Sequence, residues 1–232
     1  LYVTNHNGES VIKLDSSGKQ LLKIDAKTFR RANSVTVDAS GNIYVVDRDA
    51  DMVYKFDSSG KKVSSLGGKK FLNNPQGIAV ASNENILVVS QNNDEVVEFD
   101  QTGRVVNSIG KGVLSNPFDV KIDNNGTIYV SDTILREVAM FSRNGTLLQE
   151  FKGGAGRSAF RSTGGIEVTQ DGKLYVMDIL SSKIYVYGWE GTAGTVVSGG
   201  GNNTVNTSIL EASGLKASSL LALSSSSAKL SM

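Results

Sequence analysis

The sequence contains no cysteine and a single histidine, His6. Without cysteine the chain can form no disulfide, carry no thiol nucleophile and hold no cysteine-ligated zinc. It also lacks any run of 18 or more apolar residues, so we expect no membrane span. Positive and negative side chains almost cancel, at a formal net charge of +1. The overall charge therefore favours no particular class of partner.

Proline is scarce, with 2 residues, whereas glycine is abundant, with 25, which is typical of a fold with many tight turns. The sequence Ile-Tyr-Val, or a near variant of it, recurs along the chain, followed each time by a polar turn, an apolar strand and a glycine turn. The copies begin at Leu1, Ile43, Ile86, Ile128 and Leu174. A constant period of about 40–50 residues, with four short strands in each unit, is the signature of a β-propeller.

The second repeat shows how one unit is built. Its alternating apolar and polar residues predict strands at 34–38, 42–47, 52–56 and 62–66. β-Branched and aromatic residues at a period of two, bounded by Gly, Asp, Ser and Asn, support each strand. A β-sandwich is the alternative, but sandwiches do not repeat at a constant period.

We therefore predict an all-β fold, a β-propeller of four-stranded antiparallel blades that occupies residues 1–232 as a single domain, with five blades evident. Four residues of the first strands should be buried near the axis: Val35, Ile78, Val120 and Ile166. In the last repeat the spacing places the fourth strand at Val196–Val197. Residues 191–219, rich in Gly, Ser, Asn and Thr, are predicted to form an elaborate loop or to be poorly ordered. Leu220–Leu223 should pair with the sheet that contains residues 1–3 and so close the ring.

Three segments resemble the repeat of NHL-repeat propellers: Pro75–Val80, Asp38–Asp47 and Phe56–Gly60. The resemblance covers residues 1–190 well and residues 191–232 poorly. It implies a propeller, usually of six blades, so six are expected if the chain is a fragment. NHL propellers include RNA-binding domains of tripartite-motif proteins, extracellular adhesion modules, sensor domains and one amidating lyase. That lyase holds zinc with several histidines, a set that His6 alone cannot supply.

The connections between strands two and three, and those between blades, share one face of a propeller and are expected to carry function. The connections between blades contain many basic residues and four phenylalanines, Phe29, Phe71, Phe118 and Phe160. Basic and aromatic residues together can neutralise phosphates and stack bases. Alternatively, the loops are solvated and the phenylalanines fill the space between blades. The candidate ligand-binding residues are Arg30, Arg31, Lys69, Lys70, Phe71, Lys111, Arg136, Arg157 and Arg161.

Acidic residues, including Asp47, Asp132 and Asp178, follow the second strands on the same face. Residues 47–51 look like the start of an EF-hand loop, which needs Gly at its sixth position and Glu at its twelfth. Met52 and Ser58 stand there instead, so we predict no metal site and no cofactor. The ends of the first strands offer carboxylates without a convergent pattern: Asp38, Asp119, Asp123 and Glu167.

No assembled set of catalytic residues is evident in the sequence. The predicted function is therefore a non-catalytic binding or assembly module, a rigid scaffold that contacts other protein chains through its longer loops. We expect the chain not to be an enzyme. The alternative is binding of single-stranded RNA by the basic loops, as in tripartite-motif NHL domains. A calcium-dependent hydrolase or lactonase that uses axial carboxylates is the third hypothesis.

Four sequons make Asn125, Asn144, Asn202 and Asn206 candidates for glycosylation. The first two lie in predicted turns, where acceptor residues are expected. Chance alone gives roughly three or four such motifs in a chain this rich in Ser, Thr and Asn. The sequons permit an extracellular or cell-surface location without establishing it, and the alternative location is cytoplasmic.

Overall fold

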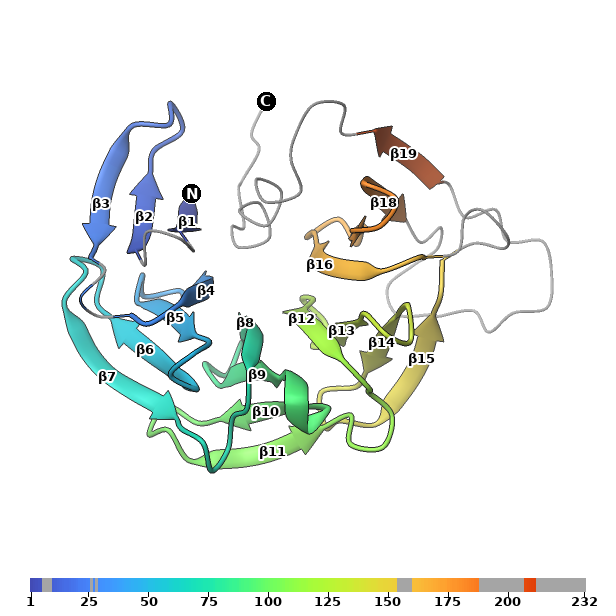
Figure 1. Cartoon of the computed structure of the whole chain (residues 1–232), viewed down its shortest axis with the longest axis horizontal. Coiled ribbons are helices and arrows are strands. Elements are labelled where there is room, and N and C mark those ends of the chain that lie inside the picture. Colours follow the sequence, from blue (N-terminus) through green and yellow to red (C-terminus); the bar gives the residue numbers. More distant parts are fainter. Residues whose placement is uncertain (6–9, 26, 28, 154–159, 188–206, 212–232) are drawn as a thin grey trace.

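Five antiparallel β-sheets are arranged as blades around a common axis (Figure 1). The computed structural model describes residues 1–5, 10–25, 27, 29–153, 160–187 and 207–211, the last range for its backbone only. In each blade the strands follow one another in chain order from the axis outward, as in a β-propeller. The predicted all-β propeller of five blades is therefore confirmed, although three strands are described in the first blade.

The strands have the following bounds. The first blade consists of β1 (Tyr2–Asn5), β2 (Ser10–Leu14) and β3 (Gln20–Ile24). The second consists of β4 (Ala32–Val37), β5 (Ile43–Asp47), β6 (Met52–Phe56) and β7 (Lys62–Gly67). The third consists of β8 (Pro75–Val80), β9 (Ile86–Ser90), β10 (Glu95–Phe99) and β11 (Val105–Ile109), with the short 3-10 helix η2 (Gln91–Asn93) between β9 and β10. The fourth consists of β12 (Pro117–Ile122), β13 (Ile128–Asp132), β14 (Glu137–Phe141) and β15 (Leu147–Phe151). The fifth consists of β16 (Thr163–Val168), β17 (Leu174–Asp178), β18 (Lys183–Tyr187) and β19 (Thr207–Glu211).

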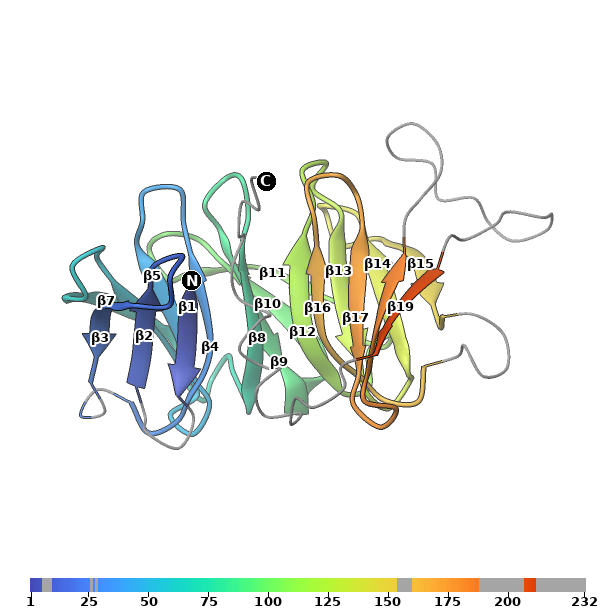
Figure 2. The ribbon, with the colours of Figure 1, turned by 90° about the horizontal axis from the view of Figure 1, so that it is seen from above.

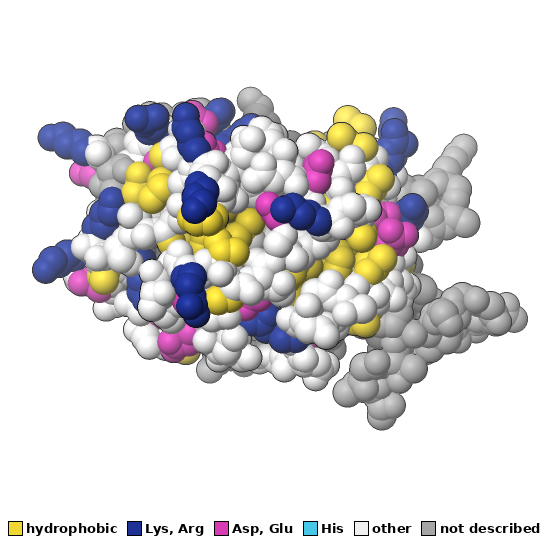
Figure 3. Space-filling model, turned by 90° about the horizontal axis from the view of Figure 1, so that it is seen from below, with side chains coloured by type: hydrophobic (Ala, Val, Ile, Leu, Met, Phe, Trp, Pro, Cys, Tyr) yellow, Lys and Arg dark blue, Asp and Glu magenta, His cyan; other side chains and the backbone are white. Residues whose placement is uncertain are grey.

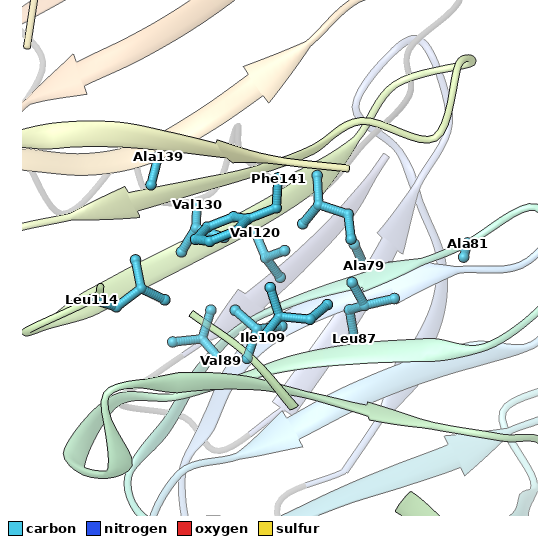
Figure 4. Close-up of a cluster of buried hydrophobic side chains, with 12 residues drawn as sticks. Ala79, Ala81, Leu87, Val89, Ile109, Leu114, Val120, Val130, Ala139 and Phe141 are labelled. Carbon is cyan, nitrogen blue, oxygen red and sulfur yellow. The ribbon is translucent and has the colours of Figure 1, made fainter. Parts of the chain in front are cut away.

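The hydrophobic core lies between neighbouring blades. Leu87 and Val89 of the third blade pack in one cluster with Val130 and Phe141 of the fourth (Figure 4). The residues predicted to be buried near the axis are at most 2% exposed: Val35, Ile78, Val120 and Ile166. Removal of this apolar surface from water is the main favourable contribution to the packing of blade on blade.

The outermost strands keep some apolar side chains in solvent. Val63 of β7 and Val106 of β11 are both second in their strands, and they are 59% and 44% exposed. The side of the molecule seen in Figure 3 shows apolar side chains of the rim among Lys and Arg residues. Single exposed apolar residues are common on protein surfaces and indicate no site by themselves.

We call the side with the connections between strands one and two, and three and four, the turn face. The opposite side, which has the connections between strands two and three and between blades, is the loop face. Figure 2 shows the blades edge-on, with connections at both ends of the strands. Both faces are therefore set by the strict up-and-down order of the strands.

A β-bulge interrupts the innermost strand of blades two to five at the same place, next to the loop face. The pairing register shifts between Ala32 and Ser34 in β4, and between Pro117 and Asp119 in β12. The same shift occurs in β8 and β16. A bulge leaves an extra residue outside the regular ladder and redirects its side chain. Asn33, Gln76, Phe118 and Gly164 hold this position in the four strands.

The last blade differs from the prediction. Its outermost strand is β19, Thr207–Glu211, whereas the spacing predicted Val196–Val197, which lie outside the described residues. The prediction assumed a constant repeat length, and the long stretch between β18 and β19 breaks that period. Leu220–Leu223, predicted to close the ring, also lie outside the described residues. Within the described residues, no helix is long and apolar enough to cross a membrane.

Candidate binding surface on the loop face

Three aspartates at the ends of the second strands have a structural role. Asp132 of β13 is buried, and its carboxylate accepts four hydrogen bonds of 2.7–3.1 Å. The donors are the backbone N–H groups of Ser115, Asn116, Ile134 and Leu135. Asp47 and Asp178 bind the corresponding connections of their own blades in the same way. These acidic residues therefore anchor the loops and are not free to bind a ligand.

No metal site is formed by these aspartates. The carboxylate of Asp47 accepts hydrogen bonds from the backbone N–H groups of Arg30, Arg31 and Ala50. Its oxygens are therefore used within the protein. Nowhere in the described ranges do three or more His, Cys, Asp or Glu side chains gather in a way that could hold a metal ion.

Three of the four phenylalanines of the basic loops pack in the core, and Phe118 is half-buried on the loop face. Phe29 and Phe160 are 4% and 3% exposed. Phe71, a candidate ligand-binding residue, is partly buried and packs edge-on against Phe99, with 6.3 Å between the ring centroids. The second interpretation of these residues, that they fill the space between blades, is therefore the one that the structure supports. The rings needed for base stacking are largely unavailable.

Most of the predicted basic residues reach solvent. Arg30, Lys69, Lys70, Arg136 and Arg161 are exposed, and none has a carboxylate within 4.0 Å in the described part of the chain. Arg31 pairs with Asp49 at 3.7 Å and Lys111 pairs with the buried Glu95 at 3.2 Å. Arg157 lies outside the described residues. Since several acidic residues of this face are buried, the charged groups that reach solvent here are mainly basic.

Side-chain amides from neighbouring blades form a hydrogen-bonded row at the axial end of the loop face. Asn33 Nδ2 donates to Gln76 Oε1 at 3.0 Å, and Gln76 Nε2 donates to Gln91 Oε1 at 3.1 Å. Gln91 Nε2 donates in turn to Asn116 Oδ1 at 3.2 Å. All three bonds point the same way, from the second blade toward the fourth. We call these four residues the amide row.

The loop face becomes apolar beyond the amide row. Phe118, which is half-buried, takes in β12 the bulge position that Asn33 and Gln76 take in β4 and β8. Ile134 and Leu180 hold equivalent positions in the turns that follow β13 and β17, and they are 62% and 64% exposed. The loop face therefore presents the amide row from blade two to blade four, exposed apolar side chains on blades four and five, and basic side chains on all of these blades.

The sequence analysis did not identify the amide row, because it searched for charged and aromatic residues. A register signal was nevertheless present. Asn33, Gln76 and Phe118 each stand two residues before a buried residue of the innermost strand. An alignment of the repeats on those buried residues would have placed all three at the axial end of the loop face.

Two of the axial carboxylates converge, contrary to the expectation of no convergent pattern. Lys121 Nζ lies 3.4 Å from Asp119 Oδ2 and 4.0 Å from Glu167 Oε2. Burial raises the pKa of Asp119 above its ordinary value. Burial also raises the pKa of Glu167 to about 7, because the attraction of Lys121 offsets burial only in part and the charge of Asp119 adds to the shift. Lys121 occupies the space between the two acids, so this cluster resembles an ion-paired inter-blade contact more than a calcium site.

Glu167 makes the stability of the protein depend on pH. Its pKa is about 7 in the folded protein and about 4.3 in an unfolded chain, so the folded state binds a proton more tightly. The contribution of Glu167 to stability is therefore present at low pH and is lost as the pH rises from about 4.3 toward 7. We expect Glu167→Gln to flatten the fall in stability across this window, measured by urea unfolding at several pH values. An unchanged slope in this variant would contradict the assignment.

Two glycosylation candidates lie on the turn face of the fourth blade. Asn125 and Asn144 are exposed in the turns that follow β12 and β14. The Asn144 Oδ1 atom accepts a hydrogen bond from Thr146 Oγ1 at 3.1 Å. A glycan on either residue would leave the loop face uncovered. Asn202 and Asn206 lie outside the described residues.

Solved structures of other propellers share this fold at low sequence identity. A streptogramin B lyase structure is 17% identical, with a TM-score of 0.68, and the match covers 90% of this chain and 64% of that one. Virginiamycin B lyase from Staphylococcus aureus is 16% identical, with a TM-score of 0.67, and the match covers 82% and 64% of the two chains. The WD40 β-propeller domain of Doa1 is 17% identical, with a TM-score of 0.59, over 72% and 54%.

These comparisons define the chain as a β-propeller and go no further. No protein-family model and no curated protein matches it, so the NHL family stays a resemblance. The chain spans 64% of the length of the two lyase structures. The expectation that the chain is not an enzyme was wrong, because propellers with this architecture include lyases. The same fold serves a WD40 domain, so function has to be argued from the site.

Proposed function

We propose that the chain is a binding module whose loop face takes an acidic, partly apolar segment of a partner protein. The observation that carries this proposal is the pair of exposed aliphatic side chains, Ile134 and Leu180, in adjacent blades. Aliphatic side chains contribute binding energy when a partner removes them from water, and a few well-packed residues near the centre of an interface carry most of that energy. Two such residues at equivalent positions of a rigid scaffold give a partner two fixed points of attachment.

The charge of the loop face indicates the character of the partner. Arg136 and Arg161 belong to the same two blades as Ile134 and Leu180, and they have no acidic partner among the described residues. Complementary charge on a partner speeds association and selects against basic competitors. An acidic segment with apolar side chains therefore fits this half of the loop face better than a neutral or basic one.

Single-stranded RNA fits the surface less well. Stacking of bases on aromatic rings is a main source of affinity for single strands, whereas Phe29, Phe71 and Phe160 pack with the core clusters and leave Phe118 as the loop phenylalanine outside them. Ile134 and Leu180 offer nothing to phosphate or ribose. The basic residues alone would provide weak binding that depends strongly on salt.

The proposal is tested with linear peptides selected on the immobilised chain from a random phage-displayed library. We expect acidic sequences with apolar residues. Their affinity, measured by titration calorimetry, should fall at least about tenfold in the double variant Ile134→Ser/Leu180→Ser. The matched control is Val63→Ser/Val106→Ser, which removes exposed aliphatic residues from the rim and should leave affinity unchanged.

Three results would contradict the proposal. The first is a selection dominated by peptides that bind both double variants equally well. The second is an equal loss of affinity in the two double variants. The third is a random single-stranded RNA that, tested at two salt concentrations, binds more tightly than any selected peptide, which would favour the RNA hypothesis instead.

A further inference from the structure

We infer that the amide row binds the backbone of an extended polypeptide segment, so that the partner is held by its main chain as well as by its apolar side chains. This inference rests on the proposed function and adds a second, independent set of contacts. It concerns Asn33, Gln76, Gln91 and Asn116, which are uncharged and run from the second blade to the fourth, whereas Ile134 and Leu180 lie on the fourth and fifth blades.

The row has unused hydrogen-bonding capacity at both ends. Asn33 donates through Nδ2, whereas its Oδ1 atom accepts no hydrogen bond from the described residues. Asn116 accepts through Oδ1, whereas its Nδ2 group donates none within the described part of the chain. The row therefore ends in a free acceptor near the second blade and a free donor near the fourth.

The internal bonds make these free ends stronger partners. Each amide in the row donates to the next, and hydrogen bonds arranged head to tail polarise one another. A ligand that donates to Asn33 and accepts from Asn116 would lengthen the row at both ends without breaking any existing bond. Gln76 is 3% exposed, so the centre of the row is held in place by its surroundings and is ready to bind without rearrangement.

A polypeptide backbone supplies the required groups. Each residue other than proline has one N–H donor and one C=O acceptor, which match the two free ends of the row. Phe118 continues the row at the same bulge position, and Ile134 and Leu180 lie on the blades beyond it. A ligand rich in hydroxyl or phosphate groups would leave these three apolar side chains without a partner, whereas a polypeptide presents polar backbone and apolar side chains together.

The test uses the peptides selected on the full chain and the variant Asn116→Asp. This change keeps the oxygen that accepts from Gln91 and replaces the free donor by an acceptor. We expect the affinity for the selected peptides to fall about tenfold, as for the loss of one hydrogen bond to a peptide group. Asn93→Asp is the matched control: it adds the same charge to the same face, and Asn93 makes no side-chain hydrogen bond within the described residues. Affinity in this control should stay within about twofold, with equal melting temperatures for all proteins.

A second measurement addresses the backbone directly. Peptides are resynthesised with a single ester in place of each amide in turn, which removes one N–H donor and leaves the side chains intact. In the parent at least one ester position should cost about three- to tenfold in affinity. The ester carbonyl is also a weaker acceptor than the amide carbonyl, so the position whose carbonyl accepts from Asn116 should lose this part of its sensitivity in Asn116→Asp.

Failure of this inference is distinguishable from failure of the proposed function. If Asn116→Asp and Asn93→Asp weaken binding equally and no ester has an effect, while Ile134→Ser/Leu180→Ser still abolishes binding, the partner binds by its side chains alone. The inference is then wrong and the proposed function stands. If no peptide is enriched, or if binding does not depend on Ile134 and Leu180, both are overturned.

Discussion

Replacement of Arg143 by methionine is expected to lower the free energy of unfolding by about 3 kcal/mol. Arg143 lies in the turn between β14 and β15, and its guanidinium contacts both carboxylate oxygens of Glu98 in the neighbouring blade. The side chain of Glu98 is 4% exposed and that of Arg143 is 33% exposed. Without Arg143 the carboxylate would stay buried with Asn85 as its nearest donor. The loss should lie at the lower end of the roughly 3–5 kcal/mol that removal of one partner of a buried ion pair costs, because water reaches part of the arginine.

The pKa of Glu98 supports the same expectation. Burial alone would raise this pKa, but the hydrogen bonds from Arg143 and Asn85 outweigh burial and hold it below its ordinary value. The ionised pair is therefore stabilised in the folded protein. The double variant Arg143→Met/Glu98→Gln should recover most of the loss, because it leaves no unpaired charge. Chemical denaturation at neutral pH measures all three proteins, and a single variant within 1 kcal/mol of the parent would show that the pair contributes little.

Replacement of Asp132 by alanine should cost at least about 3 kcal/mol. The carboxylate of Asp132 accepts four backbone N–H groups, from two different connections of the loop face. An unsatisfied buried donor costs about 1–3 kcal/mol, and the turn after β13 gives water access to some of these donors. The loss should therefore lie well below the sum of four such costs, although still among the largest effects of a single substitution.

The third blade provides an internal control for this prediction. Ser90 of β9 holds the position of Asp132, and its hydroxyl accepts one backbone N–H, from Asn73 at 3.0 Å. Ser90→Ala should therefore cost only about 1 kcal/mol. Thermal and urea unfolding of both variants would give this difference. Equal losses would mean that the number of accepted hydrogen bonds does not determine the effect.

Arg143→Met and Asp132→Ala together also separate an effect on stability from an effect on peptide binding. Arg143 and Glu98 belong to the contacts between blades near the turn face, whereas Asp132 positions the turn that presents Ile134. A loss of peptide affinity that exceeds the loss of folded protein is therefore expected for Asp132→Ala and not for Arg143→Met. This comparison would show how far the geometry of the loop face depends on its buried aspartates.

The strands of the blades could be predicted from the sequence because strand formation depends on the pattern of apolar and polar residues that are close in sequence. The strand predicted at 52–56 was found at those residues, and the strand predicted at 62–66 extends one residue further, to Gly67. The alternation of apolar residues and the glycine turns recur at a nearly constant period, so the register of one repeat predicts the next. The prediction for the last strand of the fifth blade was wrong because an insertion interrupts that period.

The candidate site was predicted only in part. The loop face and its exposed cations, such as Lys70 and Arg161, followed from the order of strands and from residue type. Whether Phe71 is stacked in solvent or packed against Phe99 depends on the neighbouring strand, which is distant in sequence. From the sequence, Asp47 and Asp132 were acidic residues on a face expected to carry function. Only the folded loops show that their carboxylate oxygens already accept hydrogen bonds from backbone N–H groups.

The sequence by itself determined that this protein is an all-β propeller and which residues form its blades, because period and alternation act over neighbouring residues. The tertiary structure alone decided which side chains meet at the axis. Asn33, Gln76, Gln91 and Asn116 are separated by up to 83 positions of the sequence and come together only when the blades pack side by side. The physical reason is that burial and hydrogen bonding depend on partners brought from other repeats: the register can place a residue at the axial end of the loop face, but it does not say which side chain of the next blade it meets.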